Sequence, residues 1–178
     1  RNPKTGKPYK KTYLKTIHNQ MNAIMNFAVK YYELKDNPVE KAGTIGISNA
    51  EEMKFWTIDE YMKFSEAMME EPFYYYCFEV LYWCGIREGE LLALTYDDFD
   101  FENKMISITK TYQVIKKKEM IGPTKTAKGI RDVRMPDRLC EEMKDYFAMC
   151  YEPDNSRAFP TSKSVLNRAL DRGAKRAG

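Results

Sequence analysis

The stretch Leu81-Tyr82-Trp83-Cys84-Gly85-Ile86-Arg87-Glu88-Gly89-Glu90-Leu91-Leu92-Ala93-Leu94 decides how the rest of the chain is interpreted. An apolar helical run stops at Gly85, the residue type that most cheaply takes the left-handed conformation that ends a helix. A second helix is predicted to start at once, because the leucines that follow recur at core-facing spacing. Arg87 therefore lies in a tight corner between two helices, with Glu90 one turn later on the same face. On this pattern alone, a surface ion pair is the favoured interpretation of the two residues.

The composition is that of a soluble globular protein. The chain has 178 residues, of which 43% are apolar and 31% charged, enough for one well-buried domain or one and a half small ones. No apolar run has the length of a membrane span and no signal peptide opens the chain, so a cytoplasmic location is expected. The four cysteines show neither CxxC spacing nor nearby histidines. They are interpreted as free thiols, and neither a metal site nor a cofactor is expected.

The positive charges are clustered although the net charge is only +3. They lie in the first fifteen residues, in residues 116–138 and in residues 163–176, whereas acidic residues fill the middle of the chain. This layout is compatible with two basic regions that hold a polyanion between them. The alternative is that the basic residues are only solvated surface.

A long N-terminal helix is predicted over residues 10–34, with apolar residues at spacings of three and four along one face. Another face of this helix carries a row of side chains that can donate hydrogen bonds. Its functional interpretation is a helix laid along DNA, with lysines on phosphates and an amide or imidazole near base edges, while plain solvated surface is the alternative. The predicted DNA-binding residues of this region are Lys7, Lys10, Lys11, Lys15, His18 and Asn22.

Residues 42–56 have no sustained period and are predicted to be an interdomain linker. Thr57 and Glu60 form a capping box that starts the next helix. The sequence then predicts two helices, over residues 73–84 and 137–150. A final helical apolar face is predicted after residue 162. Between them, period-two alternation predicts strands at residues 98–101, 105–108 (extended by 112–115), 120–121 and 130–135, with residues 124–129 as a cation-rich hairpin. The predicted fold class is mostly α with a small three-stranded antiparallel β-sheet (α+β).

The motif Gly-Ile-Arg-x-Gly-Glu-Leu-x-x-Leu, followed by the acidic and aromatic residues 96–100, resembles the first arginine box of the tyrosine recombinases, the phage integrase family. In that family the arginine grips the scissile phosphate. The resemblance therefore implies that Arg87 is catalytic and that Glu90 supports it.

Downstream, Pro123-Thr124-Lys125-Thr126 resembles the hairpin that carries the family's catalytic lysine. Lys125 is the matching position and Lys128 is the alternative. Lys128, Arg131 and Arg134 are also expected to contact DNA. A lysine at the edge of the minor groove can protonate the leaving 5′ oxygen, and no metal is required.

The family's His-x-x-Arg box and its tyrosine nucleophile are not recognised in this chain. The single histidine, His18, lies near the start, and none of the thirteen tyrosines follows such a box. The chain is therefore expected to hold the first half of a recombinase active site and to bind double-stranded DNA without cleaving it. Residues 1–41 would be the end of a helical core-binding domain, and 57–178 the first part of the catalytic domain. The intact protein would act as a homotetramer on DNA, and this piece alone as a monomer.

Two other hypotheses remain open. A non-catalytic DNA-binding or regulatory module of the same fold would also lack the histidine box and the tyrosine. A helical scaffold without a nucleic-acid role would carry the basic runs as mere surface. Binding to duplex DNA that weakens steeply with salt separates the first two hypotheses from the third.

Overall fold

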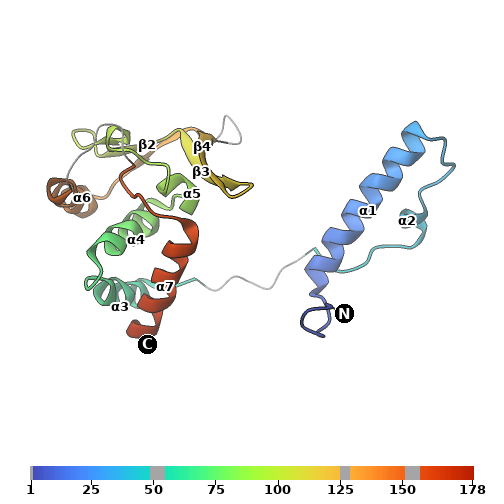
Figure 1. The fold of residues 1–178 in the computed structure, drawn as a ribbon, viewed down its shortest axis with the longest axis horizontal. Helices are drawn as coiled ribbons and strands as arrows, with labels where there is room; N and C mark the ends of the chain where they lie inside the picture. The colour runs from blue at the N-terminus through green and yellow to red at the C-terminus, as the bar shows by residue number, and fades with distance from the viewer. Residues whose placement is uncertain (1, 49–54, 125–128, 151–156) are drawn as a thin grey trace. The chain divides into compact units, whose positions relative to one another are not determined.

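The computed structural model describes residues 2–48, 55–124, 129–150 and 157–178. The chain divides into two compact units, Arg1–Phe55 and Trp56–Gly178, which are described separately (Figure 1). The boundary between them falls within the segment 42–56, where the sequence predicts a linker. No helix in the described ranges combines the length and the apolar character needed to cross a membrane.

The first unit consists of α1 (Lys11–Tyr31) and the short α2 (Pro38–Lys41). Asn37 holds them together. Its side-chain oxygen accepts from the N–H of Val39 at 2.8 Å and so caps α2. Its side-chain amide donates to the side-chain oxygens of Asn22 and Asn26 on α1, at 2.6 and 2.7 Å. A turn of helix that could not persist alone is thereby fixed against a long one.

The faces of α1 differ from the prediction at two positions. His18, expected near base edges, is only 9% exposed, and Asn22 is half-buried and engaged by Asn37. The reason is that the chain after α1 returns along this polar face. The N–H of Ile47 donates to the carbonyl of Lys11 at 3.3 Å, and a Cβ at Gly46 would overlap that carbonyl oxygen. The apolar stripe lies on the exposed side instead, at Ile17, Met21, Ile24 and Tyr31.

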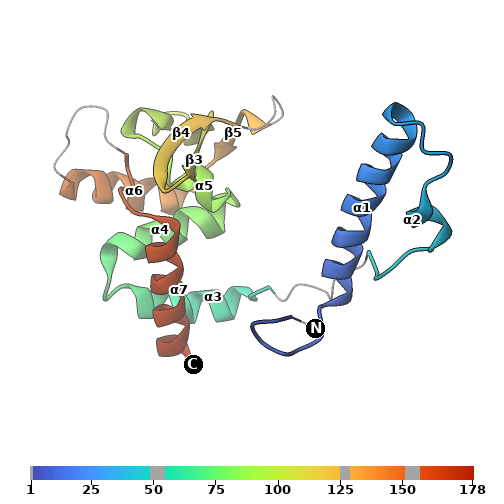
Figure 2. The ribbon, with the colours of Figure 1, turned by 45° about the vertical axis from the view of Figure 1, so that its right-hand side comes forward.

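The second unit contains the main core, built on the helices α3 (Ile58–Met68), α4 (Pro72–Cys84), α6 (Asp137–Met149) and α7 (Lys163–Ala177). The predicted capping box of α3 is confirmed: Glu60 Oε2 accepts from the N–H of Thr57, whose hydroxyl accepts from the N–H of Glu60. Helix α7 runs from the neighbourhood of α5 (Glu88–Leu91) down to α3 (Figures 1 and 2). It packs closely on α3 at Gly173, where a Cβ would overlap Met68 Sδ and Phe64.

Within the described residues, the strands form two separate antiparallel sheets. One has the order β1 (Phe99–Asp100), β2 (Met105–Ile108), β5 (Arg131–Arg134), and β1 follows the 3₁₀ turn η1 (Tyr96–Asp98). The other is a hairpin of β3 (Lys110–Ile115) and β4 (Lys118–Pro123).

The mostly helical class with small antiparallel sheets is confirmed, but the expected pairing is not. The strand at residues 120–121 was expected to pair through the 124–129 hairpin with the strand at 130–135; instead β4 pairs with β3, and β5 pairs with β2. The cause is a tight turn at Lys116 and Lys117, both with positive φ, which folds β4 back onto β3.

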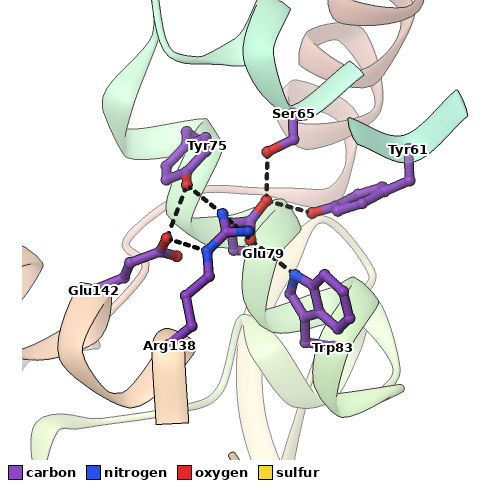
Figure 3. A network of polar contacts seen from close by, with 7 residues as sticks. All are labelled: Tyr61, Ser65, Tyr75, Glu79, Trp83, Arg138 and Glu142. Carbon is purple, nitrogen blue, oxygen red and sulfur yellow. Dashed lines mark hydrogen bonds and ion pairs between the residues drawn. The ribbon is translucent and has the colours of Figure 1, made fainter. Parts of the chain in front are cut away.

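A buried carboxylate fixes α4 between its neighbours (Figure 3). Glu79 is 1% exposed and accepts hydrogen bonds from Tyr61 (2.8 Å) and Ser65 (2.6 Å) on α3 and from the indole of Trp83 (2.9 Å). On the α6 side, Arg138 pairs with it at 3.5 Å. A buried charge is tolerated where it is paired and hydrogen-bonded in this way. The network therefore fixes the helix that ends just before Arg87.

Candidate functional site

The corner around Arg87 is built as the sequence predicts. Gly85 ends α4 in the left-handed conformation, with φ of 59°, and its N–H donates to the carbonyl of Leu81. Buried Ile86 anchors the connection, and Arg87, in extended conformation, is the N-cap of the short α5. Because this residue precedes the helix, its side chain projects outward, and it is 76% exposed.

Glu90 is the centre of the polar network at this corner. It is 3% exposed, although its carboxylate is charged. The carboxylate accepts from the N–H of Arg87 at 2.9 Å and from Arg87 Nη1 at 2.8 Å. It also accepts from Arg131 on β5, from Nη2 at 2.8 Å and from Nη1 at 3.2 Å. The pairing expected on the protein surface is therefore observed, but with a buried carboxylate shared by two arginines.

These contacts determine the protonation of Glu90. Burial by itself raises the pKa of the carboxyl group. The hydrogen bonds from Arg131 and from the backbone and side chain of Arg87 outweigh it and hold the pKa at about 2. The Glu90 carboxylate also raises the pKa of Arg131, mainly through their hydrogen bonds. The group is therefore a fixed anion at neutral pH, not a proton donor.

Arg131 contacts the Arg87 corner from strand β5. Its Nη1 donates to the carbonyl of Gly129 at 3.2 Å as well as to Glu90, and its side chain is 33% exposed. Gly129 and Thr124 border the segment 125–128. Arg131 thus connects Gly129 to the Arg87 corner.

A pocket of about 680 Å³ lies beside this corner, between α5, the β3–β4 hairpin and the start of α7. A Cβ at Gly89 would approach Thr111 Oγ1 to 2.8 Å and Lys163 Nζ to 3.4 Å. A side chain at this position would therefore require Thr111 and the backbone of β3 to shift. The described residues that line the pocket are Arg87, Gly89, Glu90, Thr111, Tyr112, Gln113, Val114, Thr124, Gly129 and Lys163.

The two lysines nominated from the sequence, Lys125 and Lys128, lie outside the described residues. Their described neighbours Thr124 and Gly129 both line the pocket next to Arg87. Arg134 is exposed on β5. In the first unit, Lys7, Lys10 and Lys11 are exposed and Lys15 is half-buried, while His18 is buried as described above.

Sequence reasoning missed two features of the site. Lys163, the first residue of α7, contributes a cation to the pocket but was recognised only as part of a basic tail. Its position right after a predicted helix cap was the available signal. The sharing of Glu90 by Arg131 left no local signal, because the two residues are 41 positions apart. Among the described residues, no group of three or more histidine, cysteine, aspartate or glutamate side chains could hold a metal ion.

Comparison with known proteins assigns the chain to a family. Residues 53–178 match the model of the phage integrase family. The prophage integrase IntR of Escherichia coli (strain K12) is 32% identical over 65 residues, which cover 36% of this chain and 15% of that protein. The ICEBs1 integrase of Bacillus subtilis (strain 168) is 28% identical over 129 residues, covering 70% of this chain and 35% of the relative. The matched part of the chain thus spans 15% and 35% of the length of these two curated relatives.

Solved structures agree on the fold. The integrase of transposon Tn1549, in complex with a circular intermediate DNA, superposes with a TM-score of 0.71 at 18% identity, over 97% of this chain and 61% of that one. A lambda integrase dimer bound to a core site gives a TM-score of 0.62 at 19% identity, over 92% and 45%. Because the family model covers residues 53–178, well over half of the sequence, the chain belongs to the phage integrase family of tyrosine recombinases.

Proposed function

We propose that this chain binds duplex DNA and supplies the phosphate-gripping part of a site-specific recombinase active site. One observation carries the proposal: Arg87 is 76% exposed beside a pocket, while its partner Glu90 is buried. A guanidinium held in this way can donate to two oxygens of a phosphate at once.

The chemistry needs little more than positioning and charge. When a phosphoryl group passes from a DNA oxygen to a tyrosine, negative charge is spread over the nonbridging oxygens. A preorganised cation at these oxygens stabilises the transition state by about 2–4 kcal/mol, as other oxyanion donors do. In the proposed reaction, Lys125 protonates the leaving 5′ oxygen and a tyrosine holds the 3′ phosphate covalently, so that the strand can be rejoined.

The rest of the proposal concerns the whole protein. Residues 57–178 would be part of the catalytic domain and residues 1–41 part of a core-binding domain. A homotetramer on two duplexes would carry out integration and excision. In support of DNA contact, Lys7, Lys10, Lys11 and Arg134 are exposed, as cations that contact phosphates must be.

Titration of a fluorescently labelled 20-base-pair duplex, followed by anisotropy over a salt series, tests the DNA-binding part. We expect the logarithm of the affinity to fall linearly with the logarithm of the salt concentration, because phosphate contacts release counterions. In Arg87→Met the slope should become shallower by about 1, the contribution of a single phosphate contact. Most of the binding should remain, since the other basic residues are unchanged.

Arg172→Met is the matched control. Arg172 is an arginine of α7 that likewise pairs with a glutamate, Glu71, but lies outside the pocket. It should leave the slope unchanged. Binding without salt dependence, or an equal change in both variants, would contradict the proposal.

A non-catalytic DNA-binding module is the second candidate, favoured by the single histidine at position 18. The two candidates differ in covalent chemistry. The polypeptide as encoded in its natural reading frame can be incubated with a nicked duplex and examined for a covalent protein–DNA adduct. An adduct supports the recombinase, whereas its absence on DNA that the protein binds supports the module.

A further inference from the structure

Glu90 is unequally shared between its two arginines. Arg131 places both terminal nitrogens on the carboxylate, one on each oxygen, whereas Arg87 uses Nη1 alone and its backbone N–H. Within the described part of the chain, Nε and Nη2 of Arg87 make no hydrogen bond that would have to be broken before a ligand binds. In Arg131, by contrast, both terminal nitrogens are engaged, since Nη2 donates to Glu90 and Nη1 donates to Glu90 and to Gly129.

This asymmetry has an electrostatic consequence. An isolated Arg87–Glu90 pair would be neutral, and the buried carboxylate would attract the guanidinium at the expense of a phosphate. With Arg131 included, two positive charges face one negative charge and the trio carries a net charge of +1. The positive charge is more accessible to a ligand at Arg87, which is 76% exposed, than at Arg131, which is 33% exposed.

We propose that Arg131 is a positioning residue that takes up the charge of Glu90 and thereby leaves Arg87 cationic and free to grip a phosphate. The inference rests on the proposed function. It also gives Arg131 a role other than the direct DNA contact expected from the sequence, because a direct contact would require two charge-assisted hydrogen bonds to Glu90 to be given up.

The test compares duplex binding, measured by anisotropy over a salt series, in single and double variants. In Arg131→Met the carboxylate has only Arg87 as a charged partner. We expect the slope to become shallower by about 1, as in Arg87→Met, although Arg131 itself touches no DNA. Adding Arg87→Met to Arg131→Met should then change the slope no further.

Removal of the charge of the Glu90 carboxylate should restore the salt-dependence slope that Arg131→Met makes shallower. Arg131→Met/Glu90→Gln again has a net charge of +1, on Arg87, and glutamine can still accept from the N–H of Arg87. We expect the native slope to return. A purely structural role of Arg131 predicts no such rescue, because the double variant has lost still more of the buried hydrogen bonds.

The chain contains a matched control. Glu71 is also shared by two arginines, Arg172 and Arg176, at the other end of the second unit. Arg172→Met and Arg172→Met/Glu71→Gln repeat the same charge changes outside the pocket and should leave the slope native. All variants are measured below their unfolding temperature, determined by circular dichroism.

Two failures can be told apart. If Arg87→Met itself leaves the slope unchanged, the proposed function is wrong. If Arg87→Met lowers the slope but Arg131→Met does not, or if the double variant with Glu90→Gln is not rescued, only the role of Arg131 is overturned. Should Arg131→Met not fold, Glu90→Gln alone decides: the native slope or a steeper one supports the inference, and a shallower slope contradicts it.

Discussion

Glu90 illustrates at the scale of one residue how a site can depend on a group that never touches the ligand. A nearly inaccessible carboxylate is stable only because four hydrogen bonds from two arginines compensate its desolvation. The same bonds fix the direction of Arg87. Stability and the geometry of the proposed phosphate grip are therefore coupled through this side chain.

The coupling predicts an acid-sensitive contribution to stability. The pKa of Glu90 is about 2 in the folded protein, below the ordinary value of 4.5. The stabilisation is therefore complete above pH 4.5 and is lost as the pH falls from 4.5 through about 2. Over this window we expect the free energy of unfolding of the native chain to fall by about 3 kcal/mol more than that of Glu90→Gln. Urea unfolding of both proteins at pH 6 and pH 2 measures the difference. A gap between the two proteins that does not change with pH would contradict it.

Among the secondary-structure elements, the β3–β4 hairpin has a turn whose residues rarely adopt the left-handed conformation that it requires. Lys116 and Lys117 connect the strands with φ of 51° and 65°, a left-handed geometry for which asparagine and glycine are preferred. The chain therefore forms this turn at a local cost, which the pairing of the two strands outweighs. The same turn is why β4 does not pair with β5 as the alternation suggested.

The turn predicts a stabilising substitution. Replacing the two lysines by Asn-Gly, as Lys116→Asn/Lys117→Gly, should raise the free energy of unfolding by about 1 kcal/mol, because the left-handed conformation is less costly for these residues. Thermal and urea unfolding measure the change. Lys118→Gly, one residue further and inside β4, is the control and should destabilise by about 0.5–1 kcal/mol. A double variant no more stable than the native chain would show that the turn carries no strain.

Across the whole molecule, the features that depend on neighbouring residues were predicted from the sequence, whereas contacts between distant segments were not. The end of α4 at Gly85, the capping box at Thr57 and the corner at Arg87 follow from neighbouring residues, and the structure has all three. The partner of β4, the burial of His18 and the bond between Arg131 and Glu90 depend on segments that meet only in the folded chain. The sequence therefore predicts the corner and its chemistry, but not the second arginine that completes its charge balance.

The most direct test of the account is whether the guanidinium of Arg87 meets phosphate when DNA binds. In a chain labelled with nitrogen-15 arginine, the side-chain N–H signal of Arg87 is identified by its loss in Arg87→Lys and followed during titration with duplex DNA. We predict that it shifts in proportion to binding, while the signal of Arg172, already held by Glu71, stays in place. A signal of Arg87 that does not move when the protein is saturated with DNA would contradict the proposed role of this residue.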